Sequence, residues 1–451
     1  MAISEQILAI RFGYGVRPGG RGAKDRAALL RGLTAPDPLA RRFARPGVKQ
    51  RLALVGKLRK ARKRRKDGKS GAEAQFRRER QAAWKWIIAD MRAFLSRAAL
   101  SDHGFRERLV AFWANHFTVS GKNSAIMLAH GAYLDEAIRP NISGRFADLL
   151  KAAVTHPAML AYLDQMTSFG PHSAVGQRRG RGLNENLARE VLELHTLGAR
   201  AHYTQNDVRQ FAELLTGLRI GKSGFTFDPG AAEPGAERIL GRSYGGGQPA
   251  LRDILEFLDD LAAHPRTAAH VARKLAVHFI ADHPPEDLVA GLTAAYRSSG
   301  GDLMQVYRAL LAHPASGGPI GRKVKLPVEL AVSSVRALDV GEIIANASPR
   351  VLRDNLVVPL RTMGQNLFRP PGPDGWSEDA ADWITPAALA ARIEWSAKLA
   401  RRHGRATDPM RLLDDVLGDM ASPALTRAVA GADERWEGVA LLLVSPEFNR
   451  R

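Results

Sequence analysis

The chain has 451 residues, no Cys, and 66 Lys or Arg residues against 46 Asp or Glu residues, which gives a formal charge of +20. With 45% apolar and 25% charged residues, the composition is typical of a folded protein and excludes a largely disordered one. The absence of Cys excludes disulfides, cysteine-ligated metal sites, iron–sulfur clusters and thiol nucleophiles.

Apolar residues spaced by three and four positions predict a mainly helical chain. The first clear example contains Trp84, Ile87, Ile88 and Met91. In chain order the predicted helices are 73–99, 105–117, 127–138, 146–162, 184–197, 205–216, 251–263, 267–281, 285–298, 303–313, 327–338 and 386–401. Strand signals are confined to the Gly/Pro-rich segment 219–248, where 225–227 and 238–240 are predicted to form a short hairpin.

These elements predict a mainly α fold: a multi-helix body, orthogonal or bundle-like, with a small β-hairpin insertion around 219–248. We divide the chain into a helical half (1–218), a Gly/Pro-rich loop or hairpin (219–250) and a second helical half (251–451). No run of about 18 apolar residues is present, and the start lacks the basic-then-apolar pattern of a signal peptide. We therefore expect a soluble protein, cytoplasmic as written, or periplasmic or exported if a leader has been removed.

The positive charge is concentrated in one segment. Between Lys49 and Arg80 there are fourteen Lys or Arg residues and three acidic ones. The bland interpretation is a solvated helical hairpin tip or a disordered loop. The functional alternative is contact with a polyanion: nucleic acid, an acidic glycan or anionic lipid. The residues that would make this contact are Lys57, Arg59, Lys60, Arg62, Lys63, Arg64, Arg65 and Lys66.

The motif GLNENLAREVLELHTLG, residues 182–198, carries the densest set of polar groups. On a regular helical wheel Glu190 and Glu193 lie in one flank of a helix that is apolar on both sides, which predicts a buried helix. Because an unpaired buried carboxylate is costly, these acids are expected to pair with Arg189, share a proton, or face a cleft or metal. Glu193 and His195 are only two residues apart, which argues against the Glu-x-x-His pattern of helical di-iron sites.

Two further segments are candidates for a polar site. In FWANHFTVS, residues 112–120, His116 ends a predicted helix and is either a structural cap or a base, with Asn115 beside it. The loop GQNLFRPPGPDGW, residues 364–376, contains Gln365 and Trp376. Its aromatic residues are expected either to dock on the body or to line a ligand groove.

These motifs, with RFGYG, HPAMLAYLD, YTQNDVRQFAELLTG, ARKLAVHF and KLPVELAVSSVRAL, occur in the order found in the family known as domain of unknown function 1800, which the chain resembles over most of its length. The resemblance implies a mainly helical bacterial protein, and a sulfatase-like protein as a possible partner. It implies no established reaction. Its polar motif residues correspond here to Asn115, His116, Asn184, Glu185, Asn186, Arg189, Glu190, Glu193, Thr204, Asp207 and Gln365. The chain has Ala232 where relatives are expected to have His in a His-Glu-Pro-Gly sequence.

Three functions remain open from the sequence. The first is an enzyme, hydrolase-like, that uses carboxylate acid–base chemistry on a polymeric or anionic substrate such as a glycan. Its predicted catalytic residues are Glu185, Glu190, Glu193 and His116, and its predicted substrate-binding residues are Asn115, Asn184, Asn186, Arg189, His195, Asp207, Gln365 and Trp376. The second is a non-catalytic polyanion-binding protein, and the third is a haem or other oxidative enzyme. The sequence identifies no cofactor and predicts no metal ligands.

Overall fold

The structure is a computed structural model that describes residues 4–20, 22–199 and 201–451. It confirms a mainly α fold in which the sheet structure is limited to two small hairpins. The helices up to the middle of the chain are α1 (Glu5–Phe12), α2 (Arg26–Thr34), α3 (Pro38–Arg42), α4 (Val48–Lys66), α5 (Ala72–Leu100), α6 (Gly104–His116), α7 (Ser124–Tyr133), α8 (Phe146–Thr155), α9 (Pro157–Tyr162), α10 (Ala174–Arg179), α11 (Asn186–Glu190) and α12 (Gln205–Leu214).

Helices also make up most of the second half. They are α13 (Leu251–Ala263), α14 (Pro265–Phe279), α15 (Glu286–Ser298), α16 (Leu303–Ala312), α17 (Pro327–Ala337), α18 (Gly341–Ala345), α19 (Pro349–Leu352), α20 (Val358–Thr362), α21 (Pro386–His403), α22 (Pro409–Val416), α23 (Pro423–Ala430), α24 (Arg435–Val444) and α25 (Pro446–Asn449). Three π-helical segments continue α-helices, namely Leu134–Ile138, Val191–Thr196 and Arg353–Val357. Short 3-10 turns occupy Arg139–Asn141, Gln165–Thr167, Pro229–Ala231, Pro314–Gly317, Ala380–Asp382 and Gly418–Met420.

A proline divides one predicted helix. The periodic segment 146–162 folds as two helices, α8 and α9, that meet at His156 and Pro157. The proline ring disfavours the helical conformation of the preceding residue, and His156 is extended, with φ −67° and ψ 137°. The His156 ring then accepts a hydrogen bond from the Ala158 N–H at 3.1 Å, which caps α9.

The strand pairing differs from the predicted one. Residues 225–227 and 238–240 do not pair with each other. Instead β1 (Leu218–Ile220) pairs with β2 (Phe225–Phe227), and β3 (Ala236–Ile239) pairs with β4 (Arg242–Gly245), both antiparallel. Leu240 and Gly241 connect β3 to β4 with φ values of 49° and 82°. Positive φ at both central residues is typical of the tight turn that suits the twist of a hairpin, and it leaves the 238–240 segment paired with its immediate neighbour.

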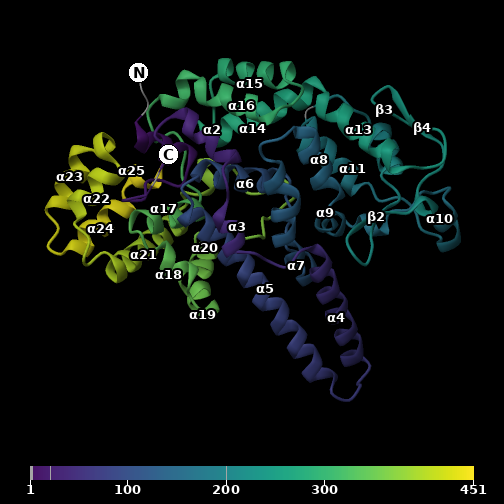
Figure 1. Cartoon of the computed structure of the whole chain (residues 1–451), viewed down its shortest axis with the longest axis horizontal. Coiled ribbons are helices and arrows are strands. Elements are labelled where there is room, and N and C mark those ends of the chain that lie inside the picture. Colours follow the sequence, from purple (N-terminus) through teal and green to yellow (C-terminus); the bar gives the residue numbers. More distant parts are fainter. Residues whose placement is uncertain (1–3, 21, 200) are drawn as a thin grey trace.

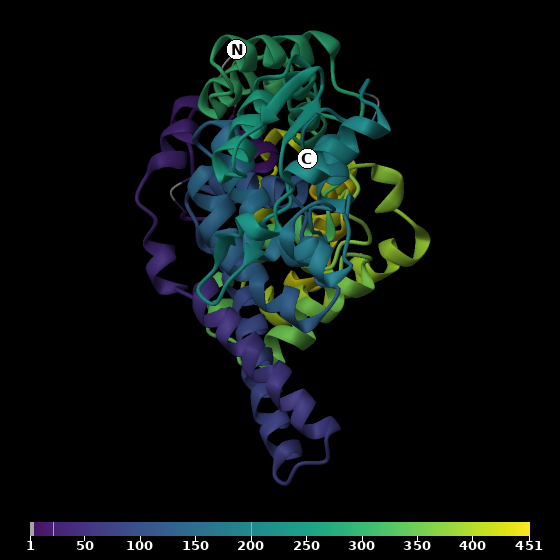
Figure 2. The same ribbon diagram turned by 90° about the vertical axis from the view of Figure 1, so that its right-hand side faces the viewer.

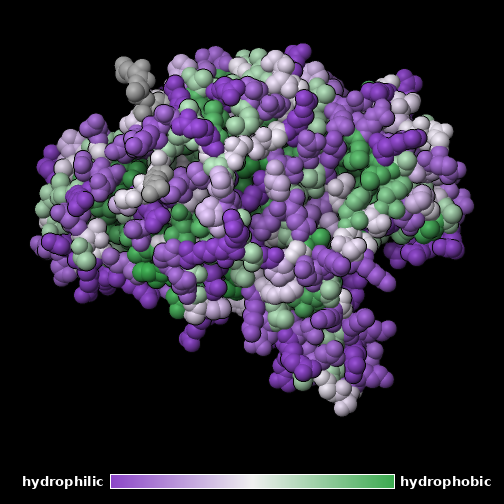
Figure 3. All heavy atoms as spheres, in the orientation of Figure 1, coloured by the Kyte–Doolittle hydropathy of each residue, from purple (hydrophilic) through white to green (hydrophobic). Residues whose placement is uncertain are grey.

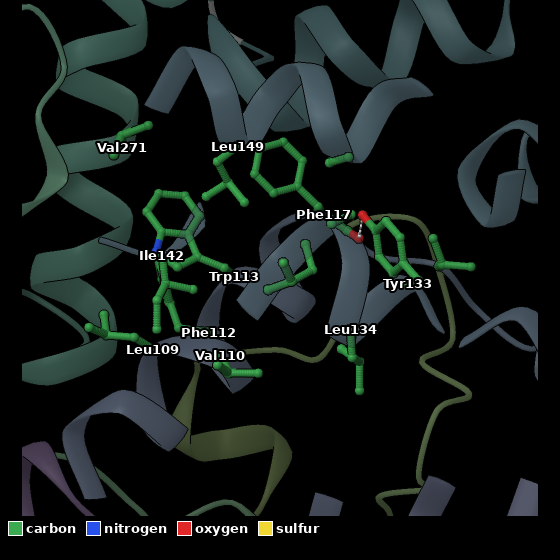
Figure 4. Packing of buried hydrophobic residues seen from close by; sticks show 14 of the residues in the cluster. Leu109, Val110, Phe112, Trp113, Phe117, Tyr133, Leu134, Ile142, Leu149 and Val271 are labelled. Carbon is green, nitrogen blue, oxygen red and sulfur yellow. Dashed lines mark hydrogen bonds between the residues drawn. The ribbon is translucent and has the colours of Figure 1, made fainter. Parts of the chain in front are cut away.

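One large apolar core joins helices from both halves of the chain. Its buried members extend from Leu8 in α1 to Trp395 in α21. Around Trp113 of α6 the core contains large aromatic and branched side chains, shown in Figure 4. Two of its polar groups are paired inside it: the Trp113 indole donates to the Tyr307 hydroxyl at 2.7 Å, and the Tyr133 hydroxyl donates to the Phe117 carbonyl at 2.9 Å. A second, smaller core forms where the C-terminal helices α21 to α25 pack against Ile10 of α1 and Leu330 and Ala337 of α17.

Helices α4 and α5 form a hairpin that projects from the body (Figures 1 and 2). Hydrophilic residues cover its outer part (Figure 3). At its base Arg51 forms a bidentate ion pair with Asp90, at 2.7 and 2.8 Å, and both side chains are only 1% exposed. Arg51 also donates to the Leu128 carbonyl of α7 at 2.5 Å. The ion pair thus joins the two helices of the hairpin at its base, and the bond to Leu128 connects them to α7 of the body.

Within the described ranges, no helix combines the length and the apolar character needed to span a membrane.

Candidate active site

The 182–198 motif folds as a helix that changes its winding. It begins as the α-helix α11 and continues as the π-helical segment Val191–Thr196, so the regular wheel used to predict its faces does not apply beyond Glu190. One side, with Leu187, Leu192 and His195, is buried. Glu190 and Glu193 are half-buried at the edge of the core. The prediction of a helix buried all round is therefore wrong, because the carboxylates lie at the boundary between the core and solvent.

In the π-helical segment, two backbone carbonyls accept hydrogen bonds from side chains of other helices. The Nε2 atom of His116, at the end of α6, lies 3.0 Å from the His195 carbonyl, and Nε2 of His270 in α14 lies 3.0 Å from the Leu194 carbonyl. Because a carbonyl oxygen only accepts, each Nε2 carries the proton and donates. Π-helical turns of this kind are frequent at functional sites.

The three histidines around this turn are neutral at neutral pH. Burial lowers the pKa of His195 to about 3 and that of His270 to about 4, and it lowers the pKa of His116 well below its usual value. The positive charge of Lys274 acts in the same direction on all three. The Nδ1 atoms of His116 and His195 are buried and have no hydrogen-bond partner among the described residues. His116 is therefore an uncharged imidazole with a free nitrogen inside the protein, not a charged helix cap.

Glu190 is the carboxyl group with the most unusual surroundings. Partial burial raises its pKa, and the negative charges of Glu193 and Asp374 raise it further, against the opposing effects of Lys122 and Arg189. No Lys, Arg or His of the described chain lies within ion-pair distance of its carboxylate, whereas Glu193 pairs with Arg189 at 3.5 Å. Two neighbouring carboxyl groups of one helix thus differ in their pairing, an arrangement that suits an acid and a base.

Arg189 pairs with the glutamates four residues before and after it, which is the arrangement that i,i+4 spacing on a helix favours. It contacts Glu185 at 3.0 Å as well as Glu193. Gln205 completes this network, because it donates to the same Glu185 oxygen at 2.8 Å and accepts from Arg189 at 3.1 Å. Glu185 is therefore held in a hydrogen-bonded structural role, and Glu190 remains outside this network.

The sequence analysis missed four residues of this cluster. Lys122 lies over the ring of Tyr162 at 4.4 Å from its centroid. Burial, followed by the charges of Glu190 and Asp374, raises the pKa of Tyr162 to about 12. Burial and Glu193 likewise raise the pKa of Tyr203 to about 12. Asp374 belongs to the loop 364–376, which the sequence had identified by its aromatic, Pro and Gly residues. The same motif therefore contained the acid.

Asn115 fixes the loop that carries Asp374. Its Oδ1 accepts from the Trp376 N–H at 2.7 Å and its Nδ2 donates to the Trp376 carbonyl at 3.0 Å, so one amide side chain satisfies both backbone groups of that residue. Gly375 has φ +86°, and a Cβ there would lie 2.5 Å from the Asn115 Oδ1. The Trp376 ring packs 5.9 Å from that of Trp383, which shows docking of the loop on the body.

A small cavity of about 80 Å³ lies under this loop, and Asn115, Gln365 and Trp376 line it together with His278 and Glu378. His278 accepts from Arg108 at 3.0 Å through Nε2 and donates to Glu378 at 2.6 Å through Nδ1. Burial lowers the pKa of His278 to about 4, and it stays neutral between a guanidinium and a carboxylate. Gln365 accepts from the Val328 N–H at 2.8 Å, which ties the loop to α17.

Lys274 of α14 lies between the histidines and the loop carboxylates. Burial lowers the pKa of its amine, and the charges of Glu378 and Asp374 oppose this effect. Among the described residues no carboxylate lies within 4.0 Å of the Lys274 amine. Buried Lys323, by contrast, forms ion pairs with both Asp282 and Glu378. Lys274 is thus a buried amine without an ion-pair partner among the described residues.

The remaining predicted substrate-binding residues have local structural contacts. Asn184 accepts from the Asn186 N–H at 3.0 Å and donates to the Asp164 carbonyl at 3.2 Å, which fixes the start of α11. Asn186 is exposed. Asp207 forms a capping box with Thr204 and accepts from the Leu240 N–H at 2.8 Å, so it connects α12 to the second hairpin.

The segment with the unusual Ala232 is also placed. Ala232 is 5% exposed, and the next residue, Glu233, contacts the exposed ring of His172. Relatives are expected to have a histidine at position 232, directly before this glutamate. In this chain a histidine from another loop, His172, contacts Glu233 instead. Among all the residues that the structure describes, no group of three or more His, Asp or Glu side chains is arranged to hold a metal ion.

Comparison with known proteins gives a family but no reaction. The family described as "Protein of unknown function (DUF1800)" matches residues 7–450, nearly the whole chain. The chain therefore belongs to this family. No curated protein and no solved structure matches it.

Proposed function

We propose that this member of the DUF1800 family is a hydrolase-like enzyme that uses carboxylate acid–base chemistry on an anionic polymer such as a glycan. Glu190 is the acid and donates a proton to the leaving group. Glu193 or Asp374, ionised, accepts a proton from the attacking water. The observation that carries this proposal is that Glu190 is half-buried with no ion-pair partner among the described residues, whereas Glu193 on the same helix pairs with Arg189. The charge of Asp374, from a loop distant in sequence, adds to the rise in the Glu190 pKa.

The cations around the cluster favour an anionic substrate. Lys122 is exposed and Arg189 is 39% exposed, so both can reach a carboxylate or sulfate on a bound polymer. Arg189 is oriented by two glutamates and Lys122 by the Tyr162 ring, which limits the conformational entropy that either side chain loses on binding. Glu185, whose Oε2 accepts from both Arg189 and Gln205, positions Arg189 in this scheme.

The test is the release of reducing ends from polygalacturonate, chondroitin sulfate and isolated peptidoglycan. Because loss of a general acid typically costs 10²–10⁴ in rate, Glu190→Gln should lower turnover by at least about 100-fold, with a melting temperature close to that of the wild type. Glu286→Gln, at a glutamate that is 77% exposed on α15 and outside the cluster, is the control and should retain wild-type activity. Undiminished turnover in Glu190→Gln, or no product from any of the three polymers, refutes the proposal.

The projecting hairpin supports a second function, the binding of a polyanion. All eight residues predicted for this contact are exposed on α4. Only one of them, Arg65, lies within 4.0 Å of an acid in the described chain, at 3.9 Å from Glu73. A row of uncompensated cations binds phosphate or sulfate groups with a steep dependence on salt.

Heparin affinity chromatography tests whether the hairpin itself, and not the overall positive charge of the protein, binds a polyanion. The triple variant Lys60→Gln, Arg62→Gln and Lys63→Gln should elute from immobilised heparin at lower salt and show a shallower salt dependence. A control with the same net charge replaces the exposed residues Arg252, Arg350 and Arg411 by Gln. Equal elution of the two triple variants would show that net charge, and not the hairpin, determines binding.

A further inference from the structure

A groove of about 390 Å³ lies at the base of the projecting hairpin, where α5 faces the π-helical segment Arg353–Val357, α20 and the start of the loop 364–376. Its volume is within the range of small-molecule sites. It is separate from the carboxylate cluster, although Asn366 and Arg369 on its wall belong to the same loop as Asp374. Neither of the two functions proposed above uses it.

The floor of the groove is apolar. It is formed by Leu58, Ala83, Ile87, Ile88, Met91, Met127, Val357 and Val358. Trp84, also on the wall, is 37% exposed, an unusual exposure for a side chain of this size. Open apolar surface beside an exposed indole favours a ligand with a hydrocarbon part.

The rim of the same groove is positively charged. It carries Arg80, Arg353, Arg361 and Arg369, and no Asp or Glu is among the described residues that line it. Arg353 is paired with Asp354 at 2.7 Å. The other three are exposed, and in the described part of the chain none of them forms an ion pair. Three uncompensated guanidinium groups around an apolar floor need an anionic group for charge complementarity.

We propose that this groove binds a single-chain anionic amphiphile. The hydrocarbon chain lies on the apolar floor against the Trp84 ring. The phosphate, sulfate or carboxylate head lies between the guanidinium groups of Arg361 and Arg369. A sugar polymer would leave the apolar floor poorly complemented, and an uncharged apolar peptide would leave the arginines without partners.

Quenching of tryptophan fluorescence by dibromostearate, added below its micelle concentration, tests the site, because bromine quenches an indole only at close contact. Wild-type protein should be quenched to saturation, and Trp84→Phe should lose the saturable part. Dodecyl phosphate should compete with the probe. Dodecyl maltoside and inorganic phosphate, each lacking one half of the ligand chemistry, should compete at least about tenfold less well.

Substitutions at the rim test the charge requirement. Arg361→Gln/Arg369→Gln should weaken dibromostearate binding by about 10- to 100-fold, as expected for the loss of two charge-assisted contacts. Arg350→Gln is the matched control, since Arg350 is highly exposed on the neighbouring helix and does not line the groove. Each variant should keep the wild-type melting temperature. Full quenching in Trp84→Phe, unchanged affinity in the double variant, or equal competition by dodecyl maltoside would overturn the proposal.

Discussion

Replacing Arg51 by Met tests how the basic hairpin is held together at its base. The substitution keeps the length of the side chain but leaves Asp90 as a buried carboxylate without its bidentate partner. Removal of one partner of a buried ion pair typically costs about 3–5 kcal/mol. At about 1.4 kcal/mol per tenfold change, the opening of α4 should become roughly 100- to 4,000-fold more frequent.

Hydrogen exchange of peptides that cover 48–66 measures this opening. The amides of α4 should lose protection by the factor given above in Arg51→Met, while those of α14 should change little. Arg59→Met, an exposed position of the same helix, is the control and should retain wild-type protection. Adding Asp90→Asn to Arg51→Met should recover part of the loss, because the buried charge is removed. A change of less than tenfold in Arg51→Met would refute the argument that this pair joins the two helices of the hairpin.

Three further changes address the candidate site and its surroundings. Asp374→Asn removes a negative charge that raises the pKa of Glu190, so the alkaline limb of the pH–rate profile should move to lower pH. An unchanged alkaline limb would show that Asp374 does not affect the pKa of the catalytic acid. Gly375→Ala places a Cβ 2.5 Å from the Asn115 Oδ1 at φ +86°, and it should displace the loop, raise hydrogen exchange over 372–378 and reduce turnover at least tenfold; wild-type exchange there would contradict the close contact. Acid should destabilise the fold below about pH 6.5, because burial lowers the pKa of His130 to about 3 and the unfolded chain then binds a proton that the native state excludes. Each such histidine contributes a slope of about 1.4 kcal/mol per pH unit between its two pKa values, so His130→Gln should flatten the fall in melting temperature between pH 6.5 and 5, and an equally steep fall in the variant would exclude His130 as a source.

The helices were predictable because their apolar spacing is strong. The segment 251–263 folds with the predicted bounds, and 386–401 differs by two residues at its end. The break at Pro157 was readable in the sequence, since proline disfavours a helical residue before it. The hairpin pairing was not, because only the three-residue turn 215–217 separates 218–220 from α12, and a three-residue strand carries too little pattern to be recognised.

The site was predictable in part. The acids and the amide of Asn115 were found from their density within two motifs. Their spatial relation to Asp374 depends on tertiary packing between segments more than 180 residues apart. The π-helical winding at Val191–Thr196 could not be predicted either, because its residues fit an α-helix equally well. Its carbonyls accept hydrogen bonds from histidines of α6 and α14, and these contacts depend on the tertiary structure.

That winding makes the number of residues between Glu190 and Gly198 as important as their identity. A π-helical turn has i→i+5 bonds and so holds one residue more than an α-helical turn, and deletion of one residue from Val191–Thr196 would restore i→i+4 bonding, in which the helix uses these carbonyls itself. The imidazoles of His116 and His270 would lose their acceptors together. In this chain the length of the segment therefore matters as much as its side chains, because the extra residue of the π turn holds α6 and α14 to this helix.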